Sequence, residues 1–149
     1  MKPILRAAEA AALLAFLLVA GCTTGTPEDE IRSLVATAEE AAEARDASAL
    51  KDLVAEDYSD AAGRAASDLR QLVHGWLIAH PSVNLLTRVD SIELEGTELA
   101  KLSVTVGMLG RDAAADSSWD LAAELWRFEL RLAREDGDWR VIRAGLQED

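Results

Sequence analysis

The spacing of apolar positions changes twice along the chain. Residues 10–20 form a continuous apolar run, residues 27–80 carry apolar side chains at helical spacing, and beyond Pro81 apolar and polar residues alternate. The patterns predict an N-terminal export segment, three helices, and four meandering antiparallel strands. This is an α+β class, with three N-terminal helices packed on a strongly curved four-stranded antiparallel sheet.

Local signals mark the predicted helices. Thr26 and Pro27 are typical of an N-cap and a first helical position, and acidic residues follow them. Asp46 caps a second helix that we expect to run out near Asp57. A third helix ends at His80, because a residue before proline disfavours the helical conformation. The apolar stripe of this third helix comprises Leu69, Leu72, Val73, Trp76 and Leu77.

Four strands are predicted at Val83–Leu94, Leu99–Leu109, Trp119–Ala133 and Trp139–Leu146. The third strand contains a change of phase, since Leu125 lies on the odd set of apolar positions and Trp126 on the even set. A β-bulge near Ala122–Leu125 reconciles the two sets and bends the strand.

The inward faces of the two central strands are predicted to be apolar and free of ionisable groups. They comprise Leu102, Val104, Val106, Met108, Trp126, Phe128, Leu130 and Leu132. Charged and polar residues alternate with them and form the solvated face, which comprises Lys101, Ser103, Thr105, Arg127, Glu129 and Arg131. This distribution argues against proton-transfer chemistry inside the domain.

The N-terminus has the parts of a secretory signal: basic Lys2 and Arg6, then an apolar run shorter than the roughly 20 residues that span a bilayer. The tetrapeptide 19–22, Val-Ala-Gly-Cys, resembles a bacterial lipobox. The resemblance implies cleavage before Cys22, the single cysteine of the chain, and lipid on its thiol. We therefore expect a signal peptide at 1–21, a lipidated tether at 22–26 and one domain at 27–149.

The charge and composition of the chain restrict the classes of partner that it can bind. The formal net charge of −12 argues against nucleic acid and against docking on an anionic lipid surface. Membrane contact is expected through the lipidated N-terminus, and Thr23 after the cysteine resembles outer-membrane sorting, with the domain facing the periplasm. The two histidines lack a ligand spacing, so neither a metal nor another cofactor is predicted.

The order of elements, the junction at residues 53–60 and the closing segment at residues 139–144 resemble the nuclear transport factor 2-like superfamily, of the SnoaL and ketosteroid-isomerase type. The resemblance covers about residues 28–147. It implies a curved sheet wrapped around the helices, with a cone-shaped pocket. The same cone serves isomerases, dehydratases, cyclases, ligand carriers and protein-binding modules, so it leaves the function open.

Three residues are weak catalytic candidates. Tyr58 and Asp60 follow the second helix, where this fold borders the pocket mouth, and the pair would donate to and abstract from a carbonyl substrate. The alternative, which we favour, is that Tyr58 packs and Asp60 caps a turn. If the first strand turns the face that carries Asp90 inward, Asp90 is a buried base. If this face points outward, Asp90 takes part in surface ion pairs. The outward alternative fits the other strands better.

An aromatic, uncharged cone suits an apolar ligand. The candidate lining residues are Trp76, Met108, Trp119, Trp126 and Phe128. The alternative is that these side chains fill the cone completely. We rank a non-catalytic binding module for an apolar ligand or an envelope protein first, a structural scaffold second and an isomerase- or dehydratase-type enzyme third. The charged sheet surface predicts a monomer or a weak dimer.

Overall fold

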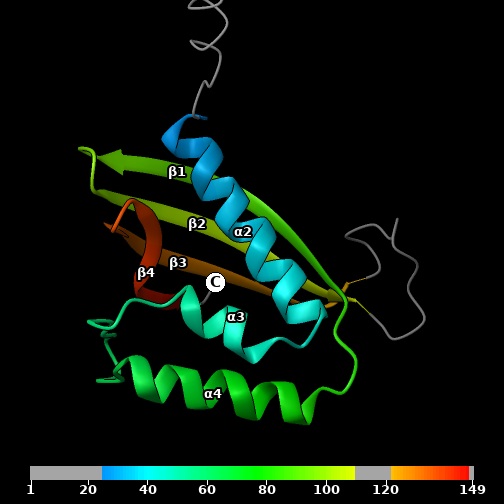
Figure 1. The fold of residues 1–149 in the computed structure, drawn as a ribbon. Helices are drawn as coiled ribbons and strands as arrows, with labels where there is room; N and C mark the ends of the chain where they lie inside the picture. The colour runs from blue at the N-terminus through cyan, green and yellow to red at the C-terminus, as the bar shows by residue number, and fades with distance from the viewer. Residues whose placement is uncertain (1–24, 110–121, 148–149) are drawn as a thin grey trace, which may run out of the picture.

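The computed structural model describes residues 25–109 and 122–147. Within these ranges the chain forms α2 (Pro27–Glu43), α3 (Ala47–Asp52), α4 (Ala66–Ala79), β1 (Leu85–Glu95), β2 (Leu99–Leu109), β3 (Ala122–Glu135) and β4 (Asp138–Gln147). The strands form one antiparallel sheet in the order β1-β2-β3-β4. The predicted α+β class is therefore confirmed (Figure 1).

The predicted starts of α2 and α3 are confirmed. The Thr26 hydroxyl accepts from the Asp29 backbone N–H at 3.2 Å, and the Asp29 carboxylate accepts from the Thr26 N–H at 3.2 Å. These reciprocal bonds satisfy donors that a helix start leaves unpaired. Asp46 caps α3 by accepting from the Ala49 N–H at 3.0 Å.

The end predicted for α3 is wrong. The helix ends at Asp52, several residues before Asp57. The chain then pairs with the edge of β4: the Val141 N–H donates to the Leu53 carbonyl at 2.9 Å, and the Ala55 N–H donates to the Val141 carbonyl at 3.0 Å. These bonds satisfy backbone groups that another helical turn would have used internally.

The helices pack in succession from the sheet outward. Helix α2 packs on β1 and β4, α3 on α2, and α4 on α3 (Figure 1). The main core lies between α2 and the sheet and contains Ile31, Ala100, Leu102, Leu132 and Trp139. A second cluster, with Ala42, Leu77 and Val83 at its centre, holds the C-terminal part of α4. Helix α4 is thus fixed mainly through α3 and this smaller cluster.

The predicted β-bulge is confirmed. Met108 pairs with Glu124 and Leu109 with Ala122, so β3 has one extra residue inside the expected interval. Trp126 and Phe128 then pair with Val106 and Val104 on the inward face. Leu125 pairs with Gly107 and is 59% exposed, because the bulge precedes it and turns its side chain outward.

Two further register shifts were not predicted. They lie between Val89 and Ser91 of β1 and opposite Arg131 and Leu132 of β3. No helix in the described ranges is both long and apolar enough to cross a membrane.

Candidate functional site

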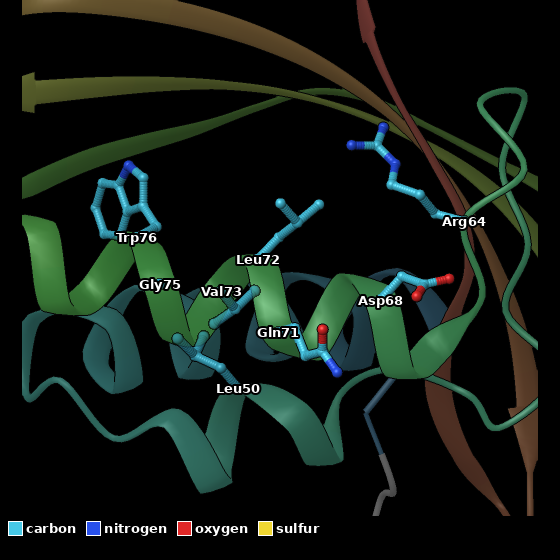
Figure 2. A pocket seen from close by; sticks show the side chains of 8 residues that line it. All are labelled: Leu50, Arg64, Asp68, Gln71, Leu72, Val73, Gly75 and Trp76. Carbon is cyan, nitrogen blue, oxygen red and sulfur yellow. The ribbon is translucent and has the colours of Figure 1, made fainter.

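An open groove of about 920 Å³ runs along one face of α4. We call it the α4 groove. Its lining residues are Leu50, Arg64, Asp68, Gln71, Leu72, Val73, Gly75 and Trp76. Figure 2 shows Leu72 and Trp76 projecting from the same side of α4, with Arg64 at the end where the helix begins. The groove therefore has a polar end at the start of α4 and an apolar remainder.

The apolar part exists because α4 carries more apolar residues than it buries. Leu77 is buried in the smaller core cluster, whereas Leu72 is 49% exposed although it belongs to the same predicted stripe. Gly75 adds no side chain, and a Cβ built there would meet no heavy atom within 4 Å. Space is therefore left between the Leu72 and Trp76 side chains.

His80 holds the Trp76 ring in place. The two rings stack with centroids 4.4 Å apart and an interplanar angle of 22°. His80 is the C-cap of α4, and its Nδ1 lies 2.8 Å from the Trp76 carbonyl oxygen. The predicted end of the third helix at His80 is confirmed.

The Tyr58 and Asp60 side chains meet beside the polar end of the groove. The Tyr58 hydroxyl donates to Asp60 Oδ2 at 3.1 Å, and the Asp60 side chain is only 2% exposed. Asp60 also accepts from the backbone N–H groups of Ala62 and Arg64, at 2.9 and 3.1 Å, and from Arg64 Nε at 2.9 Å. The predicted turn-capping role of Asp60 is confirmed.

These contacts determine how the two groups ionise. Burial raises the pKa of Asp60, but the hydrogen bonds from Arg64, Tyr58 and Ala62 outweigh it, so the pKa lies below its ordinary value. Burial, followed by the hydrogen bond to Asp60 and the charge of that residue, raises the pKa of Tyr58. Asp60 is thus a stable carboxylate and Tyr58 a stable hydroxyl donor.

Asp90 lies on the outward face of β1, as the favoured alternative predicted. Its carboxylate accepts from Arg88 Nε at 2.8 Å and from Thr105 Oγ1 at 2.5 Å. The Thr105 bond is the main cause that lowers the pKa of Asp90, Arg88 adds to it, and partial burial opposes both. Asp90 does not line the α4 groove.

The lining predicted from the sequence agrees only in part with this groove. Trp76 lines it, whereas Met108, Trp126 and Phe128 lie on the sheet and outside its lining. Trp119 and Cys22 lie outside the described residues. Arg64, Asp68 and Gln71 were not predicted as site residues. Asp68 and Gln71 are three residues apart on α4, and Leu72 and Gly75 continue this helical spacing, which is the signal that connects them. Arg64 precedes the helix and has no such signal.

Among the described residues, no group of three or more metal-ligating side chains is assembled. The α4 groove offers apolar side chains over most of its length. Its polar end offers the guanidinium of Arg64, the carboxylate of Asp68 and the amide of Gln71.

No protein-family model and no curated protein matches the sequence. Solved structures do match its fold. A domain of unknown function with a cystatin-like fold from Nostoc punctiforme has a TM-score of 0.66 at 13% identity, covering 85% of this chain and 80% of its own. An NTF-2 like protein of unknown function from Shewanella oneidensis has a TM-score of 0.62 at 13% identity, with 83% and 100% covered.

A putative scytalone dehydratase from Novosphingobium aromaticivorans has a TM-score of 0.64 at 12% identity, with 80% of this chain and 82% of that chain covered. These likenesses show that the described residues have a nuclear transport factor 2-like fold. At such low identity they show the fold alone.

Proposed function

We propose that this protein is a lipid-anchored envelope protein whose domain binds an apolar small molecule in the α4 groove without transforming it. The observation that carries the proposal is the groove itself. Its volume of about 920 Å³ lies within the roughly 300–1,000 Å³ typical of small-molecule sites. Leu50, Leu72, Val73 and Trp76 supply the apolar contact that such sites use.

The ionisation of the candidate acids favours binding over catalysis. A general base works best when its pKa lies near the working pH. The pKa values of Asp60 and Asp90 are instead lowered by hydrogen bonds that already engage their carboxylates. Both groups are therefore weak bases.

A dehydratase- or isomerase-type activity is the competing proposal. The contact between the Tyr58 hydroxyl and Asp60, 3.1 Å long, favours it. It requires that Asp60→Asn abolish turnover of a carbonyl substrate while the fold is kept. A structural scaffold, the other alternative, requires that nothing bind in the groove.

The proposal also includes the strong curvature of the sheet and the location of the protein at a membrane. The three register shifts of the sheet support a strongly curved, cone-like shape, because bulges bend and twist strands. The tetrapeptide 19–22 supports lipidation of Cys22, and Thr23 after it supports sorting to the outer membrane. The intact mass of protein from membranes tests the anchor: wild type should begin at residue 22 and carry acyl chains, and Cys22→Ser should carry none. An unmodified chain beginning at Met1 would contradict it.

A matched pair of variants on α4 tests the groove. Leu72 and Ile78 are both exposed, at 49% and 67%, but Leu72 lines the groove and Ile78 does not. We expect Leu72→Asp to weaken binding of an apolar probe, dodecan-1-ol, about tenfold or more, because it places a charge among apolar contacts. Ile78→Asp should leave binding within about twofold, since its side chain stays in water.

Native mass spectrometry of the full chain counts bound probe directly, and circular dichroism verifies that both variants fold. Equal loss in the two variants, or no binding by the wild type, would contradict the proposed function.

A further inference from the structure

We propose that the natural ligand of the α4 groove is a monocarboxylic acid with an apolar tail, and that Arg64 binds its carboxylate. The inference rests on the proposed function and adds the chemical class of the ligand. It is carried by the way Arg64 is held at the polar end of the groove.

Arg64 is positioned by a hydrogen bond from its Nε, which leaves the two terminal amino groups of the guanidinium to contact a ligand. Its Nε donates to Asp60 at 2.9 Å, and Asp60 is itself fixed by Tyr58 and by backbone N–H groups. Gly63, at φ +75°, makes the tight turn that places Arg64 beside Asp60. The guanidinium therefore loses little conformational freedom when a ligand binds.

The terminal amino groups of Arg64 lie toward the groove. Neither hydrogen-bonds to another of the described residues, and the Arg64 side chain is 47% exposed. Figure 2 shows the guanidinium extending over the end of the groove on the side of Leu72. Two parallel N–H groups match the two oxygens of a carboxylate, so a bidentate contact is available.

The neighbouring charges favour a monoanion. Asp68 also lines the polar end, and its Oδ2 accepts from the Ala65 N–H at 2.9 Å. With Asp60, which accepts from Arg64 Nε, it gives two carboxylates and one guanidinium at or beside this end of the groove, on a chain whose formal net charge is −12. A dianionic phosphate would meet more repulsion there than a single carboxylate does.

The length of the groove accommodates an extended tail. From Ala66, the first residue of α4, to Trp76 the helix rises roughly 15 Å, at about 1.5 Å per residue, and Arg64 lies two residues before the helix begins. Leu72, Gly75 and Trp76 line the path between the polar end and the His80–Trp76 stack. A chain that leaves its carboxylate at Arg64 would lie over these residues.

The experiment compares two probes of the same length, dodecanoate and dodecan-1-ol, by native mass spectrometry of the full chain at neutral pH. We expect dodecanoate to bind about tenfold more tightly, because only the acid forms the charged contact with Arg64. Equal affinity for both probes would overturn this inference while leaving the proposed function intact. Failure of both to bind would contradict the proposed function itself. Dodecyl phosphate, as a third probe, should bind more weakly than dodecanoate.

Variants assign the contact to Arg64. Arg64→Gln should lower dodecanoate affinity about tenfold and leave dodecan-1-ol within twofold, and Arg64→Lys should recover part of the acid affinity because it restores the charge. Arg32→Gln, at an exposed position of α2 outside the groove, is the control and should change neither affinity. If Arg64→Gln loses affinity for both probes together, the substitution has damaged the groove. In that case the comparison of dodecanoate with dodecan-1-ol on the wild-type protein decides the inference alone.

Discussion

Glu30 shows how one side chain joins distant parts of this fold. Its Oε2 accepts from Arg134 Nη2 at 2.6 Å and from Trp139 Nε1 at 3.0 Å. The Arg134 guanidinium also lies 4.5 Å from the centroid of the Trp139 ring and donates to the carbonyls of Thr97 and Gly137. The first turn of α2 is thereby connected to the β1–β2 turn and to the β3–β4 turn.

Glu30→Ala should lower the free energy of unfolding by about 1–2 kcal/mol, the lower part of the range for bonds to charged groups, because Glu30 keeps access to water. The variant leaves Trp139 Nε1 and one Arg134 amino group unpaired. Urea denaturation monitored by tryptophan fluorescence measures the change. Glu28→Ala removes an exposed acid from the same helical turn and should cost less than about 0.5 kcal/mol. Equal effects of the two variants would refute the role given to Glu30.

Asp60 makes a second residue-scale prediction, on pH. Its pKa is lowered in the folded protein, so its contribution to stability is complete above the unfolded value of about 3.9 and is lost as the pH falls through the folded value. Asp60→Asn should therefore be less stable than wild type at neutral pH and should lose less stability on acidification below about pH 4. Denaturation at a series of pH values measures this. Asp57→Asn, at an exposed neighbouring position, should keep the wild-type slope; the same slope in Asp60→Asn would contradict the prediction.

At the scale of the element, α4 has an interior position that packing leaves empty. Its interior contains Gly75, at an exposed position where a Cβ would meet nothing within 4 Å. Glycine in a helix interior costs roughly 0.5–1 kcal/mol relative to alanine. The residue therefore weakens the helix and at the same time opens the α4 groove.

Gly75→Ala should raise the free energy of unfolding by about 0.5–1 kcal/mol, since it restricts the unfolded chain and creates no contact. Gly63→Ala is the matched comparison: its Cβ also meets nothing, but φ is +75°. That variant should destabilise the protein by about 1 kcal/mol, because alanine is strained in the left-handed region. Thermal and urea unfolding measure both. Changes of the same sign would contradict the argument.

The starts of α2 and α3 could be predicted from the sequence, whereas the end of α3 could not. The starts of α2 and α3 depend on Thr26 and Asp46, whose caps involve residues three positions away, so they could be predicted. The end of α3 depends on Val141, far along the chain, which offers backbone partners to Leu53 and Ala55. No local pattern contains that contact.

The candidate site was predicted less well for a similar reason. Leu72 and Leu77 share one apolar stripe, and periodicity cannot distinguish the residue that enters the core from the one that lines a groove. The difference arises from packing of α4 on α3, with Leu77 in the smaller cluster. Arg64 belongs to the site only because the Asp60 turn places it there.

At the scale of the whole molecule, we expect the charged sheet face opposite the helices to limit how copies of the chain associate. The face carries internal ion pairs: Arg88 with Asp90 at 2.8 Å, and Glu95 with both Arg131 and Lys101, at 2.5 and 3.4 Å. Stable dimers bury an apolar patch from which charged residues are depleted. Here association would have to desolvate charges that are already paired, which costs free energy.

We therefore expect residues 23–149 to be monomeric, or to form a dimer that dissociates on dilution. The exposed Leu125 side chain does not change this expectation, because single apolar residues on a surface are common and do not make an interface. Light scattering over a range of concentrations, in low and high salt, measures the mass. A dimer mass that is independent of concentration would contradict the argument. Loss of such a dimer in high salt would then assign the contact to ion pairs between copies, since salt screens charges at the surface.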